Sequence, residues 1–163
     1  CAKFRKGHFE GVLDVMNKLT KIVKPKKIFM GEKDFQQLYL VKKELEKKYK
    51  TKVIPCKTIR DKDNVALSSR NLLLNKSNLT IAAKIYETLV DIKKNTENKK
   101  NIPSFLNLKK KELKNNYKIK IDYLELRNIK NLKLSNTKNN SRLFIAYYLK
   151  NVRLIDNLSL IHI

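Results

Sequence analysis

The sequence predicts an α/β chain. We expect part of a parallel-sheet domain over residues 1–71 and a small α+β domain with an antiparallel sheet over residues 72–163. Helical and strand-like segments alternate in the first part, as in βαβ crossovers. Near the end of the chain the hydrophobic period changes to two, which is typical of half-buried strands. With 163 residues, 42% of them hydrophobic, the chain is long enough to bury a real core.

The first part begins with a helix and a strand. Apolar side chains recur at helical spacing over residues 8–23. Pro25 ends this pattern, because its ring disfavours a helical conformation in the preceding residue. The apolar run 28–30 then predicts a short buried strand, and Gly31 predicts a tight turn.

A second helix and a second strand follow this turn. Asp34 is placed to cap a helix whose apolar face consists of Phe35, Leu38, Val41 and Leu45. Residues 52–54 predict another short strand, broken at Pro55. Two strands are too few for a whole parallel sheet, and the chain opens on Cys1 rather than Met. We therefore expect a fragment of a longer protein.

Residues 57–71 predict a loop, and the composition changes after it. Ser77 begins a predicted helix with one apolar face, formed by Ala82, Ile85, Leu89 and Ile92. Residues 93–101 predict a charged connector, and a further helix is expected over residues 104–115. We therefore place the domain boundary near residue 71.

The remaining segments predict the antiparallel sheet. Apolar and polar residues alternate over residues 119–123, as in a strand with one buried face. Residues 143–149 and 152–155 predict two more strands, joined by a tight turn at residues 150–151.

The formal charge of +23, from 38 Lys and Arg against 15 Asp and Glu, has two interpretations. One is a basic RNA-binding module. Lysine, however, dominates over arginine, the residue that usually forms bidentate contacts with phosphates and bases. Asparagine and isoleucine are also abundant, as an AT-rich coding bias would produce. We favour this compositional origin and expect no nucleic-acid partner.

Several other functional classes find little support in the sequence. Cys1 and Cys56 have no CxxC spacing, so we expect neither a metal site nor a structural disulfide, and free thiols fit a reducing cytoplasm. No apolar run reaches the ~18 residues of a membrane span, so we expect no membrane partner. His8 and His162 are isolated, and no catalytic triad or carboxylate pair can be assembled from this sequence.

Residues 31–34 offer groups that bind anions. They lie where a strand ends and a helix begins, which is where open α/β sheets bind their ligands. Free N–H groups and Lys33 supply positive charge, while Glu32 and Asp34 can accept hydrogen bonds from ribose hydroxyls or an amine. The alternative is an ordinary helix start with solvated charges.

A second polar cluster lies in the loop. Ser68, Ser69 and Arg70 combine two hydroxyls, backbone N–H groups and a guanidinium, which together predict a phosphate cradle. The alternative is a capping segment. Gln37, on the first turn of the helix after Gly31, offers an amide that can bind a carboxylate and a hydroxyl together. Its alternative is a surface amide.

Four segments carry a family resemblance: GHFEGV at residues 7–12, GEKDFQQL at residues 31–38, ALSSRN at residues 66–71 and VRLIDN at residues 152–157. In this order and spacing they closely resemble the pantothenate synthetases (pantoate–β-alanine ligases). The resemblance covers the whole chain and implies a partial Rossmann-like parallel-sheet domain followed by a lid domain.

The resemblance implies a two-step reaction. ATP and pantoate form pantoyl adenylate and pyrophosphate, with Mg²⁺ accompanying the ATP. The amine of β-alanine then displaces AMP to give pantothenate. Another adenylate-forming nucleotidyltransferase with the same loops is the alternative enzyme.

The resemblance also implies roles for individual residues. The catalytic residues that hold the phosphates are Lys33, Ser68 and Arg70. Contacts with ATP extend over Gly31, Glu32, Lys33, Asp34, Ile59, Leu67, Ser68, Ser69 and Arg70. Ile59 lies on the adenine side, and Gln37 holds pantoate. Val12 and Val15 line the pantoate pocket, although core packing on the helix face is an equal alternative for both valines.

The chain departs from the family in two ways. Asn64 stands where the family usually has Gly, and Asn tolerates a positive φ. The family's first half, with further phosphate and pantoate residues, is not in this sequence, so we expect a C-terminal fragment that is inactive alone. For the full-length protein, the resemblance implies a cytoplasmic homodimer.

Overall fold

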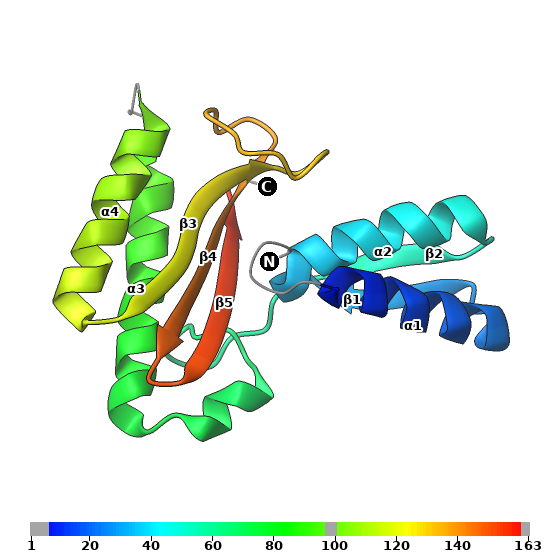
Figure 1. The fold of residues 1–163 in the computed structure, drawn as a ribbon, viewed down its shortest axis with the longest axis horizontal. Helices are drawn as coiled ribbons and strands as arrows, with labels where there is room; N and C mark the ends of the chain where they lie inside the picture. The colour runs from blue at the N-terminus through cyan, green and yellow to red at the C-terminus, as the bar shows by residue number, and fades with distance from the viewer. Residues whose placement is uncertain (1–6, 97–100, 161–163) are drawn as a thin grey trace. The chain divides into compact units, whose positions relative to one another are not determined.

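The computed structural model describes residues 7–96 and 101–160, and the chain divides into two compact units between Thr58 and Ile59. Figure 1 shows the elements of both units. The predicted domain boundary near residue 71 lies later in the chain and stays a prediction. Cys1 and His162 lie outside the described residues.

The first unit is a βαβ arrangement preceded by a helix. Helix α1 spans His8–Val23, strand β1 spans Lys27–Gly31, helix α2 spans Phe35–Lys48, and strand β2 spans Lys52–Cys56. The two strands pair in parallel, with Ile28 opposite Val53. The predicted parallel pair with a helical crossover is therefore confirmed.

The core of this unit lies between α2 and the strands. Its buried residues are Leu38, Val41, Leu45 and Val53. Val12 and Met16 of α1 pack against this cluster, as does Phe35 at the start of α2. Helix α2 thus buries the apolar face that its sequence predicts.

Two local expectations about this unit are wrong. Strand β2 does not end before Pro55, which pairs with Met30 inside the strand. Proline is tolerated there because a strand of a two-stranded sheet has an edge at which its missing N–H is not needed. Asp34 occupies the residue before α2, but its side chain makes no capping hydrogen bond.

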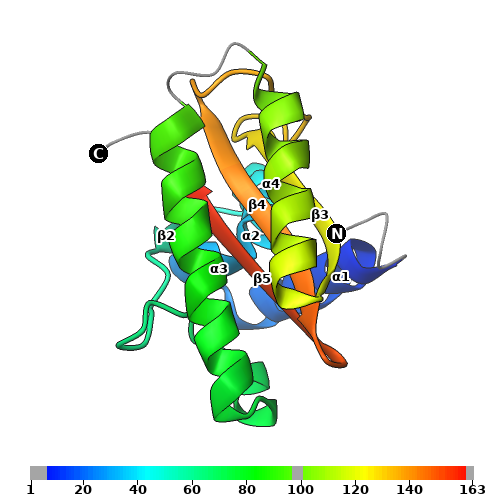
Figure 2. The same ribbon diagram turned by 90° about the vertical axis from the view of Figure 1, so that its left-hand side faces the viewer.

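The second unit contains two helices and a three-stranded antiparallel sheet. The elements are α3 (Lys76–Asn95), α4 (Ile102–Tyr117), β3 (Lys120–Asn128), β4 (Ser141–Leu149) and β5 (Val152–Ser159). The strand order is β3-β4-β5. Helices α3 and α4 cover the same face of the sheet (Figures 1 and 2). This confirms the predicted α+β arrangement.

Both helices begin slightly earlier than predicted, because asparagine side chains cap them. The Asn75 side chain accepts a hydrogen bond from the backbone N–H of Asn78, at 2.9 Å. The Asn101 side chain accepts one from Ser104, at 3.0 Å. Asparagine is a strong N-cap residue, since its short side chain reaches the free N–H groups of the first turn.

A bulge interrupts the alternation of strand β3. Ile121 lies opposite Tyr147, whereas Tyr123 lies opposite Ala146, so Asp122 is the extra residue. Ile121 and Tyr147 belong to the core beneath the helices, but Tyr123 does not. The expectation that residues 119–123 alternate along one buried face is therefore wrong at Asp122, because a bulge moves the next side chain to the other face.

The large core of this unit lies between the helices and the sheet. Its fully buried side chains include Ile85, Leu89 and Ile92 from α3 and Leu143, Ile145 and Leu149 from β4. None of the helices in the described part of the chain is both long enough and apolar enough to span a membrane.

Candidate functional site

The first part of the predicted site lies at the carboxyl end of β1. Gly31 is the last residue of β1, residues Glu32–Asp34 form a single 3₁₀ turn, and α2 begins at Phe35. Gly31 has φ −67° and ψ 134°, so it continues the strand rather than making the tight turn that we expected. A Cβ at this position would meet no atom within 4 Å, which leaves space for another molecule to approach the backbone.

The side chains around this turn differ in exposure. Lys33, Glu32 and Gln37 are half-buried, and Asp34 is exposed. Gln37 precedes the buried Leu38 on the first turn of α2. The structure thus brings residues 31–34 and Gln37 together at one strand-to-helix junction.

The two valines predicted to line the pantoate pocket differ from one another. Val12 packs against the core of the first unit, as the core-packing alternative anticipated. Val15 is 54% exposed on α1. Their contact with pantoate stays a prediction.

The second part of the predicted site is a short hairpin-like loop in the second unit. Arg60 and Ala66 form an isolated antiparallel bridge. The N–H of Leu67 donates to the carbonyl of Ile59, at 3.0 Å. Ile59 and Leu67 are therefore neighbours, and their side chains are 72% and 50% exposed. Two exposed apolar side chains of this kind can pack against a planar ring.

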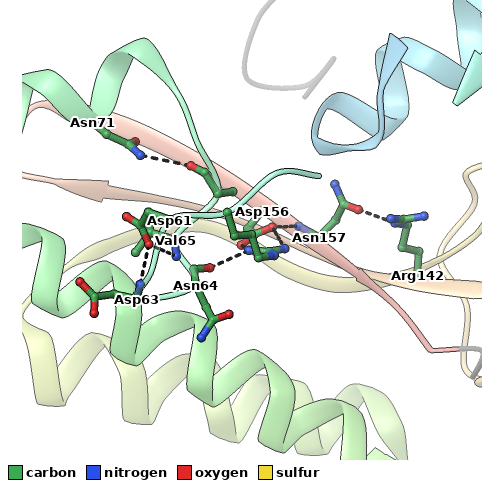
Figure 3. A network of polar contacts seen from close by, with 10 residues as sticks. Asp61, Asp63, Asn64, Val65, Asn71, Arg142, Asp156 and Asn157 are labelled. Carbon is green, nitrogen blue, oxygen red and sulfur yellow. Dashed lines mark hydrogen bonds and ion pairs between the residues drawn. The ribbon is translucent and has the colours of Figure 1, made fainter. Parts of the chain in front are cut away.

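A turn around an aspartate shapes this loop (Figure 3). The Asp61 carboxylate accepts hydrogen bonds from the N–H groups of Asp63 and Val65, both at 2.9 Å. Asn64 adopts φ 64°, which confirms that asparagine serves here where a positive φ is needed. The turn predicted from the Asp and Asn residues is thus present.

The serines and Arg70 follow directly. Residues Ser69–Leu73 form a 3₁₀ turn, and the hydroxyl of Ser68 accepts a hydrogen bond from the N–H of Arg70, at 3.3 Å. The amide of Asn71 donates to the carbonyl of Ala66, at 3.2 Å (Figure 3). Ser68 is thus both a cap and a neighbour of the exposed Ser69 and Arg70.

Arg70 differs from the other described arginines. Their guanidinium groups all bind side chains within the second unit: Arg60 binds Asp156, Arg127 binds Glu125, Arg142 binds Asn157, and Arg153 binds Asp122. Among the arginines in residues 7–96 and 101–160, Arg70 alone has a guanidinium with no hydrogen bond, ion pair or ring contact. It is available to bind a ligand.

Arg60 and Asp156 fix the loop to the sheet, and neither residue was predicted to have a role. They form a bidentate pair with N–O distances of 2.7 and 2.9 Å. Burial by itself would lower the pKa of Arg60, but its hydrogen bonds and charge interaction with Asp156 outweigh this and raise the pKa. A usable signal was the presence of an arginine in a lysine-rich chain, because only arginine makes such a forked contact.

The two parts of the predicted site belong to different units. Each part is assembled locally, from residues 31–37 in the first unit and from residues 59–71 in the second. Their convergence on one nucleotide stays a prediction.

A metal-binding cluster was not expected. Within the described residues, no group of three or more His, Cys, Asp or Glu side chains could hold a metal ion. Cys56 is a free, exposed thiol.

Comparisons with known proteins identify the family to which the chain is similar. The family model described as pantoate-beta-alanine ligase matches residues 1–159. The pantothenate synthetase of Flavobacterium psychrophilum is 38% identical over 164 residues, covering 97% of this chain and 57% of the relative. That of Francisella tularensis subsp. mediasiatica is 38% identical over 157 residues, covering 95% of this chain and 51% of the relative. The chain thus spans about half the length of these curated relatives.

Solved structures give the same result for the fold. Pantothenate synthetase from Thermus thermophilus matches with a TM-score of 0.88 and 28% identity, over 98% of this chain and 58% of that one. The Francisella tularensis pantoate-beta-alanine ligase, complexed with Beta-gamma ATP and Beta-alanine, matches with a TM-score of 0.71 and 35% identity, over 97% and 52%. The family match extends over nearly all of residues 1–163, and the chain therefore belongs to the pantoate-beta-alanine ligase family.

Proposed function

We propose that this chain supplies part of an ATP-dependent ligase that joins pantoate and β-alanine. In the first step, a pantoate carboxylate oxygen attacks the α-phosphorus of ATP, giving pantoyl adenylate and pyrophosphate. In the second, the amine of β-alanine attacks the pantoyl carbonyl and AMP leaves. The observation that carries the proposal is the exposed Arg70 guanidinium, which has no hydrogen-bond or ion-pair partner among the described residues, in a loop of a chain that belongs to this family.

The phosphate-binding role falls to Lys33, Ser68 and Arg70. A guanidinium can bind two phosphate oxygens at once, and the Lys33 ammonium adds a point charge. Backbone N–H groups of the 3₁₀ turn at Ser69–Leu73 add donors. These groups act by stabilising the negative charge that develops on the phosphates, which is usually the largest catalytic contribution.

The remaining contacts concern the base and the organic acid. The neighbouring exposed side chains of Ile59 and Leu67 suit an apolar contact with the adenine ring. The amide of Gln37 would hold pantoate, since it can donate to the carboxylate and accept from a hydroxyl. The other ATP contacts would come from residues 31–34 and Ser69. Val12 and Val15 are the candidates for the wall of the pantoate pocket.

Magnesium fits this site as an ion that arrives with ATP. Mg²⁺ usually keeps several waters and binds through substrate phosphates with one or two carboxylates, so a protein cluster of ligands is not needed. Bound to the phosphates, it would supply further neutralisation of their charge.

We further propose that the ligase acts in the cytoplasm as a homodimer, with neither nucleic acid nor membrane as a partner. Four of the five described arginines are engaged within the second unit, which argues against an arginine-based RNA-binding surface.

A completed ligase tests the proposal. The completed ligase is a chimera in which residues 1–163 of this chain replace the matching segment of the Flavobacterium psychrophilum pantothenate synthetase. That relative supplies the remaining part of the protein. We expect the chimera to form pantothenate and AMP from ATP, pantoate and β-alanine, with no product when any one substrate is omitted. The 163-residue chain alone is the control. A completed ligase that is folded by circular dichroism and forms no pantothenate would contradict the proposal.

A further inference from the structure

The loop that carries Ser68 and Arg70 is anchored to the sheet by the largely buried ion pair between Arg60 and Asp156 (Figure 3). Asp156 lies on β5 opposite Ile145, and its neighbours on the same face of the strand are Leu154 and Leu158. Ile145, Leu154 and Leu158 all pack in the core beneath the helices. The carboxylate of Asp156 therefore lies on the helix-covered side of the sheet. Arg60 reaches it from the start of the loop.

The Arg60 guanidinium binds three elements at once. Its two terminal nitrogens donate to the two carboxylate oxygens of Asp156 on β5. Nη1 also donates to the carbonyl of Asn64, at 3.0 Å, within the loop itself. The guanidinium carbon lies 4.2 Å from the centre of the Tyr86 ring on α3. The side chains of Arg60 and Asp156 are only 15% and 9% exposed.

These contacts lead directly to the proposed phosphate-binding residues. Arg60 pairs with Ala66 across the loop, and Ala66 precedes Leu67 and Ser68. The carbonyl of Ala66 also accepts the hydrogen bond from Asn71, just after Arg70. Hydrogen bonds within the loop therefore connect Arg60 to both ends of the Ser68–Arg70 segment.

Stability alone is a weak reason for this arrangement. A buried ion pair loses much of its attraction to desolvation, and apolar residues of similar volume often stabilise a protein as well or better. A forked guanidinium–carboxylate contact, by contrast, fixes direction and distance, which lysine cannot reproduce.

We propose that Arg60 and Asp156 are positioning residues, which hold Ser68 and Arg70 in place for attack on ATP. This inference rests on the proposed function and adds two residues to it. Neither residue is expected to touch the substrates, so both act through the loop.

The sheet offers a matched control. Arg153 and Asp122 form a second buried pair, with an Nε–Oδ2 distance of 2.8 Å and side chains 16% and 4% exposed. This pair joins β3 to β5, and the groups that raise the pKa of Arg153 are Asp122 and Tyr123 of β3 rather than residues 59–71. Arg60→Lys and Arg153→Lys thus each remove a largely buried guanidinium contact from the same sheet, and we expect only the first to affect the loop.

Two measurements test the inference. In the completed ligase, we expect Arg60→Lys to slow pantoate-dependent exchange of pyrophosphate into ATP by ~10²-fold, a loss that a misplacement of about 1 Å is able to cause. The KM for pantoate should stay nearly unchanged in this variant. The Arg153→Lys variant should exchange pyrophosphate at close to the rate of the completed ligase without substitutions. Adding Asp156→Asn to Arg60→Lys should cost little more, because both changes break one interaction.

In the 163-residue chain, Arg60→Lys should speed hydrogen exchange at the amides of Val65 and Leu67 by about tenfold, and Arg153→Lys should leave them unchanged. The positioning role would be overturned if the Arg60→Lys and Arg153→Lys ligases exchanged pyrophosphate at the same rate. It would also be overturned if Arg60→Lys left the hydrogen exchange of the Val65 and Leu67 amides unchanged. If the completed ligase without these substitutions has no exchange activity, the proposed function itself fails, whereas an active reference isolates the positioning role.

Discussion

At the scale of single residues, the use of arginine separates structural from functional positions. In a chain where lysine dominates the 38 basic residues, the described arginines other than Arg70 bind acidic or amide side chains. Lysine cannot replace them, because it lacks the planar fork. Arg70 keeps the same fork without using it internally, which suits a residue that binds phosphate.

Lys33 and Gln37 should affect different steps, although both lie at the β1–α2 junction. In the completed ligase, we expect Lys33→Ala to slow adenylate formation by ~10²–10³-fold, because the lost charge acts mainly on the developing phosphate charge. Gln37→Ala should instead raise the KM for pantoate. Steady-state kinetics with pantoate varied measures both effects. An unchanged KM in Gln37→Ala would leave that residue as a surface amide.

Tyr147 should make stability depend on alkaline pH. Burial, reinforced by the charge of Asp156, raises the pKa of this phenol above its ordinary value of 10.0. The unfolded chain therefore loses the phenolic proton at a lower pH than the folded chain. The stabilisation is complete below pH 10 and falls by about 1.4 kcal/mol per pH unit as the pH rises above it.

Urea unfolding between pH 9 and 11 measures this dependence. We expect Tyr147→Phe to have a shallower loss of stability than the parent chain over that range, because one raised phenol is gone. Equal slopes for the two proteins would mean that Tyr147 titrates alike in the folded and unfolded chains.

At the scale of elements, hydrophobic periodicity predicted most of the fold. The apolar faces of α2 and α3 follow from a spacing of 3.6, the first part of β3 follows from a spacing of two, and β1 and β2 follow from short apolar runs. Periodicity could not locate the bulge at Asp122 or the continuation of β2 through Pro55, because both depend on the partner strand. A loop at residues 57–71 was predicted, but its anchor was not, since Arg60 and Asp156 are 96 residues apart in sequence.

The asparagine cap of α3 gives a prediction at this scale. Asn75→Ala removes the acceptor for the N–H of Asn78, so we expect the second unit to lose about 1 kcal/mol of stability. Asn75→Asp keeps an acceptor and adds a charge that the helix dipole favours, so it should retain the stability. Thermal unfolding of the two variants makes the comparison. Equal destabilisation by both changes would count against the cap.

At the scale of the whole molecule, the two units have very different cores. Among the described residues, 18 buried side chains form the core of the second unit and four form that of the first. Buried apolar area is the main favourable contribution to folding, so the second unit should be the more stable. The described part of the first unit also has a sheet of two strands, whose outer edges are unpaired within that part.

Hydrogen exchange on the 163-residue chain tests this ranking. We expect slow amide exchange in β3, β4 and β5 and faster exchange in β1 and β2. We also expect the chain alone to form no pantothenate with saturating substrates, because it spans about half the length of its relatives. Strong protection confined to residues 27–56 would reverse the ranking, and turnover by the chain alone would contradict the need for the rest of the ligase.

We propose above all that the loop with Ser68 and Arg70 binds the phosphates of ATP in a pantoate-activating enzyme. The most direct measurement is pantoate-dependent exchange of labelled pyrophosphate into ATP by the completed ligase and its Arg70→Ala variant. Losing one such donor typically costs ~10²–10³-fold in rate. We predict a loss of this size with the pantoate KM almost unchanged. Exchange by Arg70→Ala at the rate of the reference would contradict the claim.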